Sequence, residues 1–135
     1  GIEGALRDAV SQSRALMGID VSADLRAPTD SLGDHQQTVV LRVAQEALQN
    51  ARKHASASKV SVTTRLDDDH WVLEISDDGK GFDLAAVAAR GRRNFGLQFM
   101  RERAELIGAR LDVRSHPGEG TIVRLAIPMG EEESR

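Results

Sequence analysis

The sequence predicts an α+β fold: a two-layer sandwich in which one mixed β-sheet is covered on one face by about three helices. Three observations support this prediction. Long stretches place apolar residues at helical spacing, shorter stretches alternate apolar and polar residues, and the two kinds are interleaved along the chain. At 135 residues, the chain is long enough for one domain with a sizeable core.

The composition is that of an ordinary globular domain, with 40% apolar residues, 29% charged residues and a net charge of −3. This slight negative charge gives no long-range attraction to nucleic acid or to an anionic membrane, so we expect neither as a partner. The chain contains no cysteine, which excludes disulfides, thiolate catalysis and cysteine-ligated zinc. No stretch approaches the roughly 18 to 20 apolar residues of a membrane span, and no secretory signal opens the chain.

The first third of the chain predicts a helix, a strand and the start of a long helix. Residues 3–17 have helical spacing and end at Gly18. Residues 19–25 alternate in polarity and predict a half-buried strand. Residues 28–33 are rich in turn-forming residues, after which Asp34 can cap the next helix.

That long helix carries the most informative pattern, LRVAQEALQNARKHA at residues 41–55. Beside its apolar stripe, Glu46, Asn50, Lys53 and His54 are three or four residues apart and therefore share a face. An acid, an amide and two basic groups at the rim of a core suggest a site for a ligand that is both anionic and metal-bound. A solvated helix face with an i,i+4 pair explains the same spacing equally well.

The rest of the chain predicts two hairpins separated by a helix. Residues 59–66 and 70–76 alternate in polarity around a turn of three aspartates. Residues 96–107 have helical spacing, and residues 110–115 and 121–128 form a second alternating pair. We expect the domain to span residues 1–129 and the charged residues 130–135 to form a disordered tail. Because the chain starts abruptly inside a predicted helix, we expect it to be part of a longer protein.

Two glycine motifs accompany the predicted strands. In Asp77-x-Gly79-x-Gly81, alternate glycines let a ligand approach the backbone, and Asp77 can accept a hydrogen bond from an exocyclic amine. A tight turn explains the same motif. In the second motif, Gly118-x-Gly120-Thr121, hairpin chemistry fully explains the glycines but not the Thr121 that follows them, although threonine is common in strands.

A third motif, Asn94-Phe95-Gly96-Leu97, opens a helix, where exposed N–H groups attract phosphate oxygens. Three arginines lie just upstream: Arg90, Arg92 and Arg93. A solvated charge run is the simpler interpretation of these arginines, and phosphate-facing residues of a lid are the functional one. The segment between Phe82 and Gly96 is short, so we expect any lid to be small.

Taken in order, the motifs closely resemble the asparagine box and the three glycine boxes of the GHKL ATPase superfamily. The resemblance covers residues 3–128, and within the superfamily the chain is similar to the catalytic and ATP-binding domain of a bacterial sensor histidine kinase. The stretches VAQEALQNARKHA and GLQFMRERAELIGARLDVRSHPGEGTIVRLAIP resemble the subgroup whose partner response regulators are of the NarL type. The resemblance implies the Bergerat ATP-binding fold, with ATP and Mg²⁺ as cofactors.

The resemblance also implies a role for each motif residue. Asn50 would hold Mg²⁺, Glu46 would act as general base or polarise the incoming histidine, and Asp77 would accept from the adenine amino group. Thr121 would support Asp77. The remaining positions would admit the nucleotide or contact its phosphates: Lys53, His54, Gly79, Gly81, Gly96, Leu97 and Gly120.

These roles imply transfer of the γ-phosphoryl group of ATP to a histidine on a dimerisation domain absent from this chain, and then to a response regulator. None of the four histidines stands in the His-Asp or His-Glu context of a phosphoacceptor helix, so we expect this domain to need the separate dimerisation domain for transfer. We also expect this domain to be cytoplasmic. Two alternatives share the nucleotide residues: a protein-serine kinase of the anti-sigma-factor type, and a module that binds ATP without transferring it. The Met-Arg-Glu-Arg sequence at residues 100–103 favours the sensor kinase, and Glu46 argues against a module that only binds.

Overall fold

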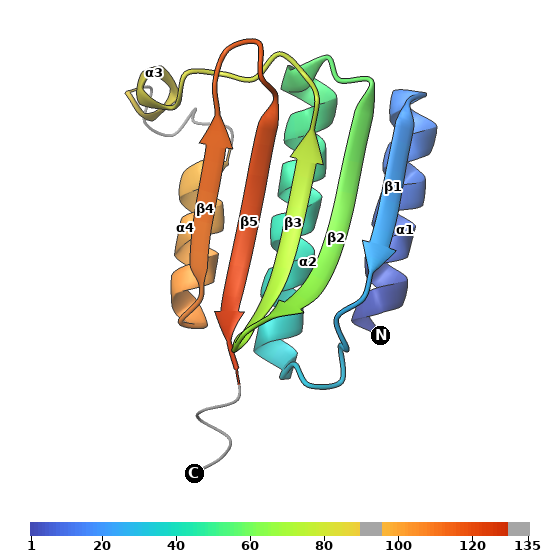
Figure 1. The fold of residues 1–135 in the computed structure, drawn as a ribbon, viewed down its shortest axis with the longest axis vertical. Helices are drawn as coiled ribbons and strands as arrows, with labels where there is room; N and C mark the ends of the chain where they lie inside the picture. Colours follow the sequence, from blue (N-terminus) through green and yellow to red (C-terminus); the bar gives the residue numbers. More distant parts are fainter. Residues whose placement is uncertain (90–95, 130–135) are drawn as a thin grey trace.

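The computed structural model describes residues 1–89 and 96–129, which form two layers (Figure 1). Three helices lie on one face of the sheet: α1 (Ile2–Met17), α2 (Asp34–Asn50) and α4 (Leu97–Leu106). This arrangement confirms the predicted fold class. The arginines of the expected lid, with Asn94 and Phe95, and the tail at residues 130–135 lie outside the described residues.

The sheet has five strands in the order β1-β2-β3-β5-β4. Their bounds are β1 (Asp20–Leu25), β2 (Lys59–Asp67), β3 (His70–Asp77), β4 (Arg110–Ser115) and β5 (Thr121–Pro128). The β1 and β2 strands are parallel and the other pairs are antiparallel, which makes the sheet mixed as predicted. Because β5 lies beside β3, the register places Asp77 directly opposite Thr121.

The core lies between the helical layer and the sheet. Its largest fully buried side chains include Leu6 and Met100 from the helices and Leu73 and Leu125 from the strands. Trp71 is also fully buried, and its indole N–H donates to the carbonyl oxygen of Pro28 at 2.8 Å. No helix within residues 1–89 and 96–129 is long and apolar enough to cross a bilayer.

The start of α2 differs from the prediction, because Gly33 rather than Asp34 is the capping residue. Gly33 has an extended backbone, and its N–H donates to the side-chain oxygen of Gln36 at 2.8 Å. This Gln36 contact satisfies a backbone donor that precedes the helix. Asp34 is the first helical residue, where its negative charge favours the positive end of the helix dipole.

Candidate functional site

The site is built around the C-terminal end of α2, which passes at Asn50 into a single π-helical turn, η1 (Ala51–Ala55). The wider hydrogen-bond spacing of a π turn changes where Lys53 and His54 point, compared with the regular helix that the sequence predicts. The carbonyl oxygen of Ala55 accepts from the backbone N–H of Lys80 at 2.6 Å. The end of the long helix is therefore tied to the loop that follows β3.

That loop begins at Asp77 and Asp78, whose carboxylates have different partners. Asp77 accepts from the N–H of Gly79 at 2.9 Å, whereas Asp78 accepts from the N–H groups of Ser58 and Lys59 at 2.8 and 2.9 Å. A Cβ atom at residue 79 would collide with the carbonyl oxygen of Ala55. Glycine is thus required here by the close approach of the helix end, and Asp78 holds the segment after η1 in place.

The turn between β4 and β5 closes the site from the other side. Gly81 and Gly120 both have positive φ, at 64° and 77°, and side chains there would collide with the carbonyl oxygens of His116 and Asp77. The N–H of Gly118 also donates to the carbonyl oxygen of Lys80. The two loops therefore pack backbone against backbone, which only glycines at these positions permit.

Ser115 joins these loops through its side chain and was not identified from the sequence. Its hydroxyl accepts from the N–H of Phe82 at 2.9 Å and lies 3.1 Å from the carbonyl oxygen of Gly120 and 2.8 Å from the hydroxyl of Thr121. Since a carbonyl can only accept, the Ser115 proton goes to Gly120 and Thr121 donates to Ser115. The signal in the sequence is a serine in register with the inward-facing Leu111 and Val113 of the same strand.

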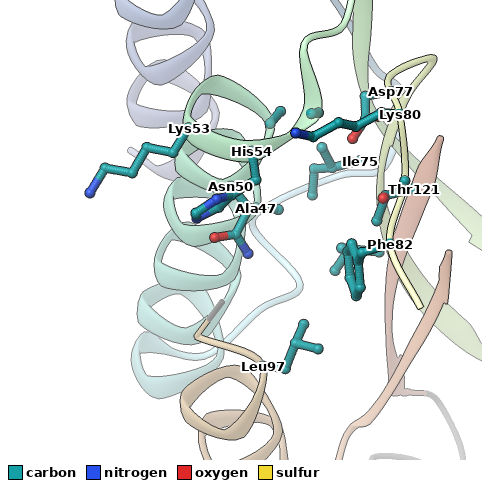
Figure 2. A pocket seen from close by; sticks show the side chains of 14 residues that line it. Ala47, Asn50, Lys53, His54, Ile75, Asp77, Lys80, Phe82, Leu97 and Thr121 are labelled. Atoms are coloured by element: carbon teal, nitrogen blue, oxygen red, sulfur yellow. The ribbon is translucent and has the colours of Figure 1, made fainter. Parts of the chain in front are cut away.

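Between the helix end and the two loops lies a cavity of about 280 Å³ (Figure 2). It brings together seven of the residues singled out in the sequence: Asn50, Lys53, His54, Asp77, Gly81, Leu97 and Thr121. The other lining residues are Ala47, Ala51, Ala55, Ile75, Lys80, Phe82 and Val123. The lining thus combines apolar walls with a few polar groups, as in most small-molecule sites.

Four of the predicted residues do not line the cavity but lie behind it. Gly79 and Gly120 form the loop contacts described above. Gly96, at the start of α4, lies against Glu46, since a Cβ atom there would be 2.9 Å from that side chain. Glu46 is half-buried at this contact, outside the cavity.

Glu46 belongs to a chain of polar contacts along α2 and η1. With the amide of Gln49 oriented to satisfy both neighbours, its nitrogen donates to Glu46 at 3.0 Å and its oxygen accepts from the Lys53 ammonium at 3.0 Å. Figure 2 shows the Lys53 side chain pointing away from the other labelled residues. Gln49 therefore orients both side chains and was not identified from the sequence.

Two titratable groups of the cavity have shifted pKa values. Burial raises the pKa of Asp77, and the charge of Asp78 adds to this effect, while the N–H groups of Gly79 and Thr121 oppose it. Burial lowers the pKa of His54, which is the largest effect on that residue, and the positive charges of Lys53 and Lys80 lower it further. At one end of the cavity burial thus disfavours the charged form of Asp77, and at the other end burial and the two lysine charges disfavour protonation of His54.

Among the described residues, no group of three or more histidine, aspartate or glutamate side chains is arranged to hold a metal ion. Asn50 contributes one amide oxygen or nitrogen at the cavity wall, next to His54 (Figure 2). A metal ion here would need most of its ligands from a bound molecule and from water.

The cavity lies between a helix end and glycine loops, with an acid at one end and lysine side chains at the other, which suits a ligand that carries both a hydrogen-bond donor and negative charge. Residues 35–131 match the family described as histidine kinase-, DNA gyrase B-, and HSP90-like ATPases. The chain belongs to this family and is an ATP-binding domain, which confirms the resemblance stated from the sequence.

Similar proteins include two histidine kinases. The chain is 38% identical over 100 residues to the signal transduction histidine-protein kinase/phosphatase DegS of Brevibacillus brevis, covering 74% of the chain and 25% of that protein. It is 34% identical over 135 residues to the sensor histidine kinase LiaS of Bacillus subtilis, covering 98% of the chain and 36% of that protein. The chain therefore spans about a quarter to a third of these relatives.

A similar solved structure is the histidine kinase domain from the blue-light activated histidine kinase of Erythrobacter litoralis EL346. The TM-score is 0.77 at 21% identity, with 96% of this chain and 61% of that chain covered. At this identity the likeness bears on the fold, and it agrees with the two-layer architecture described above.

Proposed function

We propose that this chain is the ATP-binding catalytic domain of a two-component sensor histidine kinase. It transfers the γ-phosphoryl group of ATP to a histidine on a dimerisation domain, from which a response regulator of the NarL type receives it in the cytoplasm. One observation carries this proposal: a single cavity joins Asp77 on the sheet side to Asn50 and His54 on the helix side. The family membership supports the same assignment.

The Asp77 end of the cavity suits an adenine base. The carboxylate can accept from the exocyclic amine of adenine, which guanine lacks at the equivalent position. The apolar side chains of Ile75 and Val123 line the cavity and can pack against the ring. Preference for adenine follows because a buried acceptor left unpaired by the wrong base is costly.

The opposite end suits the phosphates. In this proposal Asn50 ligates Mg²⁺, since a hard cation prefers oxygen ligands, and the nucleotide phosphates complete its coordination. When bound, the ion neutralises charge that develops on the phosphates during transfer. Lys53, His54 and the start of α4 at Gly96 and Leu97 contribute further positive potential around the triphosphate.

Glu46 is proposed to receive or orient the proton of the attacking imidazole. Glu46 lies outside the cavity, against Gly96 at the start of α4, and its partial exposure leaves it open to a partner domain. The hydrogen bond from Gln49 limits the directions in which the carboxylate can point. Such positioning supplies most of what phosphoryl transfer needs from a protein.

Two measurements in sequence test the proposal. Calorimetry with Mg²⁺ should show binding of ATP and much weaker binding of GTP. The domain is then mixed with the dimerisation domain of its parent protein and γ-labelled ATP, and acid-labile label should appear on a histidine of that partner. Label on a serine would favour the anti-sigma-factor type of kinase, and ATP binding without any transfer would favour a sensing module.

A further inference from the structure

We propose that Lys80 is an additional nucleotide-binding residue, whose ammonium group contacts phosphate oxygens of ATP bound in the cavity. The inference rests on the proposed function and adds a cation that the motif residues do not include. It is carried by three independent observations: a fixed backbone, a side chain that reaches over the cavity, and the absence of a competing partner for its charge.

The backbone of Lys80 is held on both sides. Its N–H donates to Ala55 at the end of η1, and its carbonyl oxygen accepts from Gly118 in the turn between β4 and β5. Its neighbours Gly79 and Gly81 have no room for a side chain, because a Cβ atom at either position would collide with backbone. Lys80 is therefore the one position between these glycines from which the loop projects a side chain, and its starting point is fixed.

The side chain itself reaches over the cavity. Lys80 is one of the lining residues, and Figure 2 shows it extending from beside Asp77 toward the end of the helix that carries His54. Its positive charge contributes to the lowered pKa of His54, which lies on the helix side of the cavity. A phosphate chain running from an adenine at Asp77 toward Asn50 would pass beneath this ammonium.

No carboxylate within residues 1–89 and 96–129 forms an ion pair with Lys80. Asp77 is the single acid that lines the cavity among the described residues, and it accepts from Gly79. By contrast, the Lys53 ammonium bonds to Gln49. The Lys80 charge is thus available to a bound anion without first breaking an ion pair within the described part of the chain.

The test compares nucleotide binding in three variants of the chain. Lys80→Met keeps the length of the side chain and removes its charge, and Lys80→Arg keeps the charge. Lys59→Met is the matched control, because Lys59 is an exposed lysine that does not line the cavity. Calorimetry with Mg²⁺ measures the affinity of each variant for ATP, ADP and adenosine, and thermal unfolding verifies the fold.

For Lys80→Met we expect ATP and ADP to bind about 5- to 30-fold more weakly, near the lower end of the range for a hydrogen bond to a charged group, because solvent screens the exposed Lys80 side chain. Adenosine should bind as in the unmodified chain, and the salt dependence of ATP binding should decrease. Lys80→Arg should recover most of the loss, and Lys59→Met should bind all three ligands normally.

Unchanged ATP affinity in Lys80→Met would overturn the inference while leaving the proposed function intact. An equal loss of adenosine affinity would also overturn it, because the residue would then act through the loop and not through phosphate. If the unmodified chain binds no ATP at all, both the proposed function and this inference fail. These outcomes distinguish a failure of the Lys80 inference from a failure of the proposed function.

Discussion

Ser115→Ala is the substitution that best tests how the cavity is held together. Only Thr64 and Ser115 are buried polar residues in the described part of the chain, each 2% exposed. Loss of the Ser115 hydroxyl removes the acceptor of the Phe82 N–H and the partners of Gly120 and Thr121. Because the Ser115 hydroxyl is buried and three groups lose it as a hydrogen-bond partner, we expect the free energy of unfolding to fall by about 1–3 kcal/mol. In a domain of this size, each kcal/mol of stability lost lowers Tm by about 3–5 °C.

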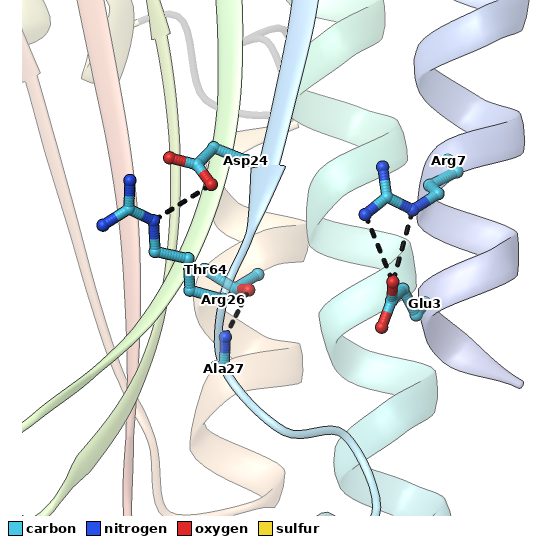
Figure 3. A network of polar contacts seen from close by, with 6 residues as sticks. All are labelled: Glu3, Arg7, Asp24, Arg26, Ala27 and Thr64. Carbon is cyan, nitrogen blue, oxygen red and sulfur yellow. Dashed lines mark hydrogen bonds and ion pairs between the residues drawn. The ribbon is translucent and has the colours of Figure 1, made fainter.

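Thr64→Val provides the matched control. The Thr64 hydroxyl accepts from the N–H of Ala27 at 3.1 Å, at a part of the sheet that does not line the cavity (Figure 3). Its loss also leaves a buried donor unsatisfied, so we expect a similar loss of stability. ATP affinity should separate the two variants: unchanged in Thr64→Val, and at least about 5-fold weaker in Ser115→Ala, because Phe82 and Thr121 line the cavity.

Denaturant unfolding and calorimetry check both variants. A free energy of unfolding for Ser115→Ala within about 0.5 kcal/mol of that of the unmodified chain would refute this prediction, because ordinary surface substitutions have effects of that size. The prediction is also refuted if both variants lose ATP affinity equally, since the effect would then follow from stability and not from the position of the hydroxyl.

Three further substitutions address the proposed roles. Asn50→Ala should abolish Mg²⁺-dependent ATP binding in calorimetry with little change in Tm; normal binding would exclude Asn50 as the ligand. Glu46→Gln should keep ATP affinity and lose label transfer to the dimerisation domain by at least about 100-fold, the usual range for a general base; equal loss of both would indicate a structural role. Asp77→Asn should weaken ATP binding about 10-fold or more. Without nucleotide, the same substitution should raise Tm at pH 7, because burial raises the pKa of Asp77 and so disfavours its charged form in the folded state. A lower Tm would contradict this sign.

The pKa shifts also fix the direction of the pH dependence. The folded state holds the Asp77 proton more tightly than the unfolded state, so stability from this group falls as pH rises from about 4 through the raised pKa. For His54 the folded pKa is lowered, so stability falls as pH drops below about 6.5 toward that value. Unfolding measured across this range in Asp77→Asn should lose the first trend and keep the second.

Local patterns in the sequence were sufficient to predict the five strands and three of the helices, but not the short helix α3 (Leu84–Ala88). Alternating polarity in residues 59–66 and 70–76 identified β2 and β3, and helical spacing identified α1, α2 and α4. The cap of α2 was wrong by one residue, because an aspartate and a glycine next to each other are both good caps and the contact from Gln36 decides between them.

The site was predictable only where its residues lie in a recognisable motif. Asp77 and the glycines were identified, yet the reasons for those glycines involve Ala55 and His116, which are distant in the sequence. Lys80 stands inside the same motif but is interpretable only once its loop is seen to cross the helix end. Gln49 carries no local signal beyond its polarity, and the one signal for Ser115 is its place in register with the inward-facing side chains of its strand.

The π turn at the end of the long helix was also not predicted. A regular α-helix through residues 51–55 follows from the alanine spacing, but the Ala55 carbonyl is taken by the N–H of Lys80. The helix end, which forms a π turn, lies against the loop after β3, and Gly79 is the residue that permits this close approach. By themselves, the half-buried Asp77 and the clustered positive charge at His54 oppose folding, since each disfavours a charged form. In the proposed function, a ligand with an amine at one end and phosphates at the other would reverse both effects at once, so the features that cost this domain stability would be the ones that select ATP.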